Sequence, residues 1–129
     1  IGSKSFKDMA RAIADSIEEL KDKGINSIAV ICKTLDRCKE IQKIIKKNVP
    51  QLQLITGKED KYQGGMVIVP SYLSKGLEFD AVLIAGGEEY FHEELDIKLL
   101  YVAMTRALHK LDIYYTGELT KVLEDIEHG

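Results

Sequence analysis

Apolar residues recur along this chain with two spacings, and each spacing predicts a different kind of element. A spacing of three to four residues is typical of helices that bury one face. Ser5 can cap the first such helix and Gly24 can end it. The third helix is apolar almost all round, which predicts that more than one of its sides is covered. This spacing predicts helices over residues 3–23, 34–48, 95–108 and 119–126.

Short runs of consecutive apolar residues predict buried strands. The elements follow the order helix–strand–helix–strand–strand–strand–helix–strand–helix, which indicates an α/β fold with a mainly parallel sheet. No internal repeat or low-complexity stretch divides the 129 residues, so we expect a single domain over residues 1–129. The strands are predicted at residues 27–32, 51–55, 66–70, 81–85 and 111–115.

Composition narrows the class of protein. With 45% hydrophobic and 30% charged residues, the chain has the composition of an ordinary globular domain. It has no apolar run near the roughly 18 residues of a membrane span and no signal-like start, so we expect no membrane partner and a cytoplasmic location. Cys32 and Cys38 have no second Cys or His pair nearby, and we interpret them as reduced packing residues.

Basic residues gather in one part of an otherwise acidic chain. The formal net charge is −3, so nucleic-acid binding would have to depend on local charge. Residues 33–47, which begin with Lys33, carry six basic and two acidic side chains. Two interpretations stay open: a surface for a phosphate backbone, or the solvated face of an ordinary helix.

The polar segment SYLSKGLEFD, residues 71–80, joins two of the predicted strands. Open α/β sheets bind ligands beyond the carboxyl ends of their strands, so we expect a site here. Lys75 and Glu78 lie three residues apart in a predicted helical turn and can also simply pair with each other. The residues expected near a strand's carboxyl end are Ser71, Tyr72, Lys75, Gly76 and Glu78.

A single arginine, Arg106, interrupts the apolar segment LLYVAMTRALHKL at residues 99–111. A guanidinium in an apolar helix needs an anionic partner, because an unpaired buried charge is strongly destabilising. Two partners stay possible at this point: an acidic side chain of the same domain, or the phosphate of a ligand.

Several motifs of self-contained catalysts are absent from the sequence. It has no GxxxxGK[ST] phosphate loop, no GxGxxG after a strand, and no HExxH or GxSxG. His92 is a lone histidine in a predicted loop, so we expect no metal site. We therefore expect these residues to complete an active site that another domain begins.

Three segments resemble those of a known family. SYLSKGLEFDAVLI, residues 71–84, resembles motif V of superfamily 1 helicases of the UvrD/Rep/PcrA type, and LLYVAMTRALHKLDI, residues 99–113, resembles their motif VI. AVICKTLDRCK, residues 29–39, is similar to a third family segment, so the resemblance covers residues 28–115. The wording PSYLSKGLEFDAV is most similar to the HelD-like branch.

The resemblance implies that the chain is domain 2A, the C-terminal RecA-like domain of a longer chain. Its fold would be a three-layer RecA-like (P-loop NTPase-type) domain without its own phosphate loop, because the N-terminal domain 1A carries that loop. ATP would bind with Mg²⁺ in the cleft between the two domains, with the metal held mainly by the missing one. The parent would be an ATP-dependent DNA helicase or translocase, and this fragment alone would be inactive.

The resemblance also assigns roles within the two motifs. Glu78 would accept hydrogen bonds from the ribose hydroxyls, and Arg106 would be the catalytic arginine finger on the γ-phosphate. Gly76 would allow a close backbone approach, and Lys75 would support the site or the strand. An arginine supplied by a second domain makes hydrolysis depend on closure of the cleft.

Three residues would contact single-stranded DNA. The family's motif V has a Thr and a His where this sequence has Pro70 and Tyr72. Ser71 would replace the Thr contact through its hydroxyl or its amide, and Tyr72 would stack on a base. Lys33 falls where the family has an Arg near the strand, while Leu35 replaces a family Asn.

Two other functions stay open. A HelD-like factor would use ATP-driven motion on RNA polymerase, which makes a protein the working partner. A non-catalytic α/β binding module would keep the two segments only as structural remnants. A parent sequence without an upstream GxxxxGK[ST] would favour that last function.

Overall fold

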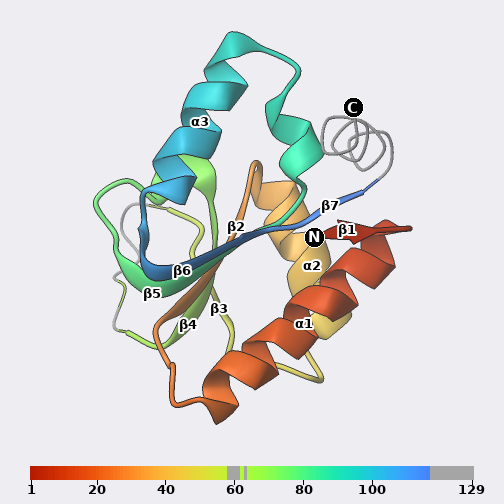
Figure 1. Ribbon diagram of the computed structural model, residues 1–129, viewed down its shortest axis with the longest axis vertical. Coiled ribbons are helices and arrows are strands. Elements are labelled where there is room, and N and C mark those ends of the chain that lie inside the picture. Colours follow the sequence, from red (N-terminus) through yellow and green to blue (C-terminus); the bar gives the residue numbers. More distant parts are fainter. Residues whose placement is uncertain (58–61, 63, 117–129) are drawn as a thin grey trace, which may run out of the picture.

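The computed structural model describes residues 1–57, 62 and 64–116, and its centre is a five-stranded sheet (Figure 1). Every strand pair in this sheet is parallel, and the order is β3–β4–β2–β5–β6. The predicted class, α/β with a mainly parallel sheet, is confirmed. The helix predicted over residues 119–126 lies outside the described residues. The strands are β2 (Ile28–Cys32), β3 (Gln53–Leu54), β4 (Met66–Pro70), β5 (Phe79–Ile84) and β6 (Ala107–Ile113).

Helices cover both faces of the sheet and give the predicted three layers (Figure 1). All five residues of β2 are buried, and their side chains alternate between the two hydrophobic clusters. A strand covered on both sides reads as one continuous apolar run, which is why IAVIC was recognisable. One face packs against α1 (Phe6–Asp22) and α2 (Leu35–Ile45); the other packs against α3 (Glu94–Met104) and the 3₁₀ helices η1 (Ser71–Leu73) and η2 (Gly87–Tyr90).

Both helices of the first layer begin at side-chain caps. Ser5 Oγ accepts a hydrogen bond from the Asp8 amide at 3.1 Å, which confirms Ser5 as the cap of α1. Thr34 Oγ1 accepts from the Arg37 amide at 3.2 Å, so Thr34 caps α2. The helix α1 starts later than predicted because the chain before it is extended. There β1 (Gly2–Ser3) pairs in parallel with β7 (Tyr115–Thr116).

The connection from β4 to β5 decides where the motif V residues lie. These two strands are parallel and β2 lies between them, so residues 71–78 must return from the carboxyl edge of the sheet to its amino edge. Leu73 and Leu77 pack on the cluster beneath α3 and hold this segment on that face. Ser71 therefore follows the carboxyl end of β4, whereas Glu78 precedes the amino end of β5. The prediction that all five motif V residues lie near a carboxyl end is wrong for Glu78.

The third helix is shorter than predicted and is covered on one side only within the described residues. It ends at Met104, Thr105 and Arg106 form a turn, and β6 begins at Ala107. The apolar pattern continues through Leu108, but pairing with β5 makes these residues extended, so Arg106 is not inside a helix as predicted. The outer face of α3 exposes Leu95, Ile97 and Tyr101 to 64%, 51% and 67%.

Candidate nucleotide and nucleic-acid sites

Glu78 and Arg106 lie side by side at the amino edge of the sheet. Each directly precedes a strand, and the first residues of those strands, Phe79 and Ala107, are register partners. The Phe79 amide donates to the Arg106 carbonyl at 3.0 Å, so the two leading segments are hydrogen-bonded to each other. The Glu78 side chain is exposed and that of Arg106 is half-buried. The structure thus brings together one residue from each predicted motif.

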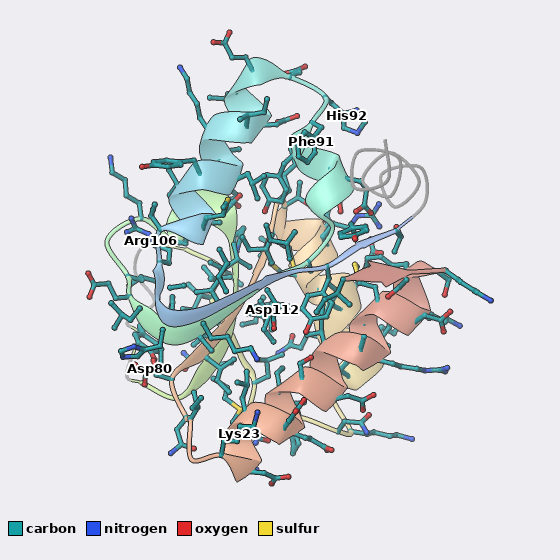
Figure 2. All side chains as sticks on the ribbon, viewed as in Figure 1. Lys23, Asp80, Phe91, His92, Arg106 and Asp112 are labelled. Carbon is teal, nitrogen blue, oxygen red and sulfur yellow. The ribbon has the colours of Figure 1, made fainter. Side chains whose placement is uncertain are left out.

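The Arg106 guanidinium rests on the carboxyl-terminal end of α3 (Figure 2). Its Nε donates to the Val102 carbonyl at 3.0 Å, and one Nη donates to Thr105 Oγ1 at 3.0 Å. Thr105 Oγ1 donates in turn to the Val102 carbonyl at 2.9 Å. An arginine is well placed there because the last carbonyls of a helix are partly negative. Among the residues that the structure describes, Arg106 forms no ion pair with a carboxylate, so the first of its two possible partners is not found.

Lys75 and Gly76 form an exposed turn ahead of Glu78. Gly76 has a φ of +87°, and a Cβ added to it would meet nothing within 4 Å, so glycine is needed here for its backbone conformation. The Leu77 amide donates to the Ser74 carbonyl at 3.0 Å and closes this turn. No ion pair joins Lys75 to Glu78 within the described part of the chain, so the simple pairing considered for them is not formed.

Lys33, Ser71 and Tyr72 gather at the opposite, carboxyl edge. Ser71 Oγ donates to the Lys33 carbonyl at 3.4 Å, which holds the end of β4 against the end of β2. The Ser71 side chain is fully buried, so its hydroxyl serves this contact. Tyr72, the next residue, is 51% exposed and presents its ring to solvent. The surface that a ligand can reach at this edge therefore consists of Tyr72 and the side chain of Lys33.

Lys33 has an acidic partner that sequence reasoning missed. Its Nζ lies 2.9 Å from Asp96 Oδ1, and the two side chains are only 23% and 8% exposed. Asp96 Oδ2 also accepts from the Glu93 amide at 3.1 Å and so closes the first turn of α3 in a capping box. The hydrogen bond from Lys33 holds the pKa of the Asp96 carboxyl below its ordinary value. A capping box was readable at Glu93 and Asp96, but nothing local in the sequence indicated the pairing with Lys33.

The basic segment over residues 33–47 is divided between paired and exposed cations. Arg37 Nε donates to Glu89 Oε1 at 3.2 Å, Arg37 Nη1 donates to Glu40 Oε2 at 3.1 Å, and the guanidinium lies 5.0 Å from the centre of the Phe6 ring. Burial raises the pKa of the Glu89 carboxyl although Arg37 opposes the shift. The lysines further along the helix remain exposed, and they are Lys39, Lys43, Lys46 and Lys47.

Other candidate chemistry is structural. Cys32 and Cys38 are buried thiols of the core between β2 and α2, and burial raises the pKa of Cys32. The described residues contain no group of three His, Cys, Asp or Glu side chains that can hold a metal ion. Of the helices that the structure describes, none has the length and apolar character needed to cross a bilayer.

Comparison with known proteins decides the family. Residues 65–114, which include both candidate motifs, match the family model of the UvrD-like helicase C-terminal domain. The C-terminal domain of a possible DNA helicase from Lactobacillus plantarum WCFS1 has 30% sequence identity to this chain and superposes with a TM-score of 0.78. That match covers 90% of this chain and 71% of the other. The chain belongs to the UvrD-like helicase C-terminal domain family.

More distant structures show that this UvrD-like domain has the RecA-like fold of helicase domains. Domain 2 of the DEAD-box helicase Mss116p, solved bound to an RNA duplex, is 15% identical with a TM-score of 0.61, and the match covers 100% of this chain and 57% of that one. The Pyrococcus furiosus Hef helicase domain is 14% identical with a TM-score of 0.62, covering 95% of this chain and 28% of that one. The UvrD-like domain is thus a fraction of the length of these two proteins. The comparison with curated proteins gives no match.

Proposed function

We propose that this UvrD-like domain is the second motor domain of an ATP-dependent superfamily 1 DNA helicase or translocase. In this proposal ATP binds between it and an N-terminal RecA-like domain of the same polypeptide. The observation that carries the proposal is the pairing of Glu78 with Arg106 at the amino edge, where both side chains reach the surface and no carboxylate of the described residues holds the guanidinium.

Arg106 is suited to the γ-phosphate because its present partners are weak competitors. It donates to a carbonyl and a hydroxyl, both uncharged, and an arginine has five donors in all. Hydrogen bonds between a charged and a neutral group contribute about 1.5–3 kcal/mol each, and exchanging them for bonds to a phosphate makes both partners charged. The charge that develops during phosphoryl transfer would then be stabilised by a group that arrives only when the cleft closes.

The other amino-edge residues fit the sugar and the loop around it. The Glu78 carboxylate is an acceptor for ribose hydroxyls, and the Lys75–Gly76 turn provides an exposed backbone next to it. Mg²⁺ does not fit this edge as a resident ion, because the described residues offer no set of three candidate ligands. The metal and the phosphate loop belong to the partner domain in this proposal, and bound Mg²⁺ would supply charge neutralisation on the phosphates.

The carboxyl edge is proposed as part of a single-stranded DNA track. Tyr72 presents an exposed ring for stacking, and the Lys33 ammonium lies beside it for a phosphate. The buried hydroxyl of Ser71 positions these two residues through its bond to the Lys33 carbonyl. RNA polymerase, the other partner considered from the sequence, gains no support from the comparisons.

The test is ATP turnover by the complete protein, with and without single-stranded DNA, in wild type and Arg106→Ala. We expect turnover to fall by about 10³–10⁵-fold while nucleotide binding changes little, since a finger acts on the transition state. Arg11→Ala is the matched control, because Arg11 is exposed on α1 on the opposite face of the sheet. Unchanged turnover in Arg106→Ala would refute the role of the finger, and a complete protein that binds no nucleotide would favour the non-catalytic binding module.

A further inference from the structure

One helix, α3, touches both proposed sites. It has 11 residues, and a helix of that length measures about 16 Å. Its first turn carries Asp96, which pairs with Lys33 at the carboxyl edge of the sheet. The chain leaves its last turn at the amino edge, where Arg106 bonds to the Val102 carbonyl (Figures 1 and 2). A displacement of this single rigid element would therefore be felt at both edges.

The first turn of α3 is fixed in place by a charge. Asp96 is enclosed to the point that 8% of its side chain is exposed, and its two oxygens are divided between the Lys33 ammonium and the Glu93 amide. Removing one partner of an enclosed ion pair is strongly destabilising, because the remaining charge lacks compensation. Loss of Lys33 would leave Asp96 with the amide alone, and the carboxylate would gain from moving toward water together with the first turn.

A strand phosphate is a natural competitor for Lys33. The ammonium has three donors and is 23% exposed, so a phosphate lying beside Tyr72 can approach it directly. Asp96 and the phosphate both bear negative charge, and they repel each other when both are held at one ammonium. Binding of the strand and retention of Asp96 in its present position therefore oppose each other.

The last turn of α3 fixes Arg106 by contacts internal to that turn. The guanidinium bonds to Val102 and Thr105, so it travels with the helix end rather than with the sheet. The outer face of α3 carries no described element over Leu95, Ile97 and Tyr101, so within the described residues only its inner face resists a shift.

We propose that the Lys33–Asp96 ion pair couples the two sites: a strand phosphate that takes Lys33 from Asp96 releases the first turn of α3 and lets the helix carry Arg106 toward the nucleotide. The inference rests on the proposed function, because it assumes that Arg106 reaches ATP and that Lys33 contacts the strand. Asp96 is a positioning residue in this scheme and touches neither ligand. By reciprocity, a nucleotide that draws Arg106 away should also strengthen strand binding.

The experiment uses the complete protein as wild type, Asp96→Asn and Lys33→Met, with oligothymidylate as the strand. ATP turnover is measured with and without the strand, and strand affinity by fluorescence anisotropy. Asp96→Asn keeps the shape and an acceptor for the Glu93 amide but removes the charge. Couplings between sites are commonly about 5–150-fold, so we expect strand-free turnover to rise about 5- to 10-fold in both variants. Strand affinity should rise in Asp96→Asn and fall in Lys33→Met.

Glu89→Gln is the matched control, since it removes the Arg37 ion pair of the same edge from η2 rather than from α3. We expect its ratio of strand-stimulated to strand-free turnover to stay at the wild-type value. If Asp96→Asn keeps that ratio while Arg106→Ala abolishes turnover, the coupling is wrong and the proposed function stands. If Asp96→Asn lowers both turnovers in proportion, together with the melting temperature, Asp96 is only a helix cap and the coupling is again wrong. If Arg106→Ala leaves turnover unchanged, the proposed function fails and the coupling fails with it.

Discussion

The Tyr90 phenol allows a sharp test of the packing at the carboxyl edge. Its side chain is fully buried, and in the described part of the chain its hydroxyl has no hydrogen-bond partner. Tyr114 is just as buried, but its hydroxyl is hydrogen-bonded to Ser16 Oγ. Burial raises the pKa of both phenols, which keeps them neutral in the folded domain. The two tyrosines differ in whether the hydroxyl is satisfied, so the same substitution should have opposite effects on stability.

Tyr90→Phe should raise the free energy of unfolding by about 1 kcal/mol, because a buried hydroxyl without a partner costs about 1–3 kcal/mol and the lost oxygen also gives up some packing. Tyr114→Phe should lower it by about 0.5–1.5 kcal/mol, since it removes a hydrogen bond and leaves Ser16 without that partner. Entropies of unfolding near 2.1 cal/mol/K per residue convert 1 kcal/mol into a shift of roughly 4 °C for a chain of 129 residues.

The measurement is urea unfolding followed by far-ultraviolet circular dichroism, which suits a chain without tryptophan. The slope of the free energy against urea should be equal in wild type and both variants, so that midpoints report stability alone. A loss of stability in Tyr90→Phe as large as that in Tyr114→Phe would mean that the Tyr90 hydroxyl is satisfied, and the reasoning would be refuted.

Acid should destabilise the domain through Asp96: its pKa is lower in the folded chain than in the unfolded one, so its contribution is present above about pH 4 and is lost as the pH falls through the folded value. Asp96→Asn should therefore flatten the decline of the urea midpoint below about pH 4, and an unchanged decline would contradict the assignment. Gly76→Ala should lower the unfolding free energy by roughly 1–2 kcal/mol from its positive φ alone. Gly86→Ala should lower it further, because its Cβ would also collide with the Glu89 carboxylate; equal losses would argue against that collision. Tyr72→Ala should weaken oligothymidylate binding by about 1–3 kcal/mol in anisotropy titrations with little change in melting temperature, whereas unaltered affinity would remove the ring from the proposed track.

Local features of the sequence carried most of the fold. The run MVIVP became β4 with the predicted bounds, because a strand buried on both faces has no polar position to blur its ends. Ser5 and Thr34 were recognisable as caps, since capping depends on residues three apart. The juxtaposition of Glu78 with Arg106 also followed from the resemblance of two short segments to known motifs.

What failed depended on contacts between distant parts of the chain. Residues 105–108 continue an apolar pattern, but the hydrogen bond from the Phe79 amide to the Arg106 carbonyl places this stretch at the start of a strand. The position of Glu78 at the amino edge follows from the order of the strands, which periodicity does not reveal. The ion pair between Lys33 and Asp96 joins residues far apart in sequence, and none of their sequence neighbours indicates it.

The strand order also has a consequence for synthesis of the chain on the ribosome. β2 is made early, yet both of its neighbours in the sheet, β4 and β5, are made late. From Cys32 to Pro70 is 38 residues, and at about 5–20 residues per second the IAVIC segment waits roughly 2–8 seconds for its first ladder partner. During that interval α1 and α2 are the only described elements able to shield it, and they cover one face. The other face stays open to chaperones or to neighbouring nascent chains until the second half of the domain emerges.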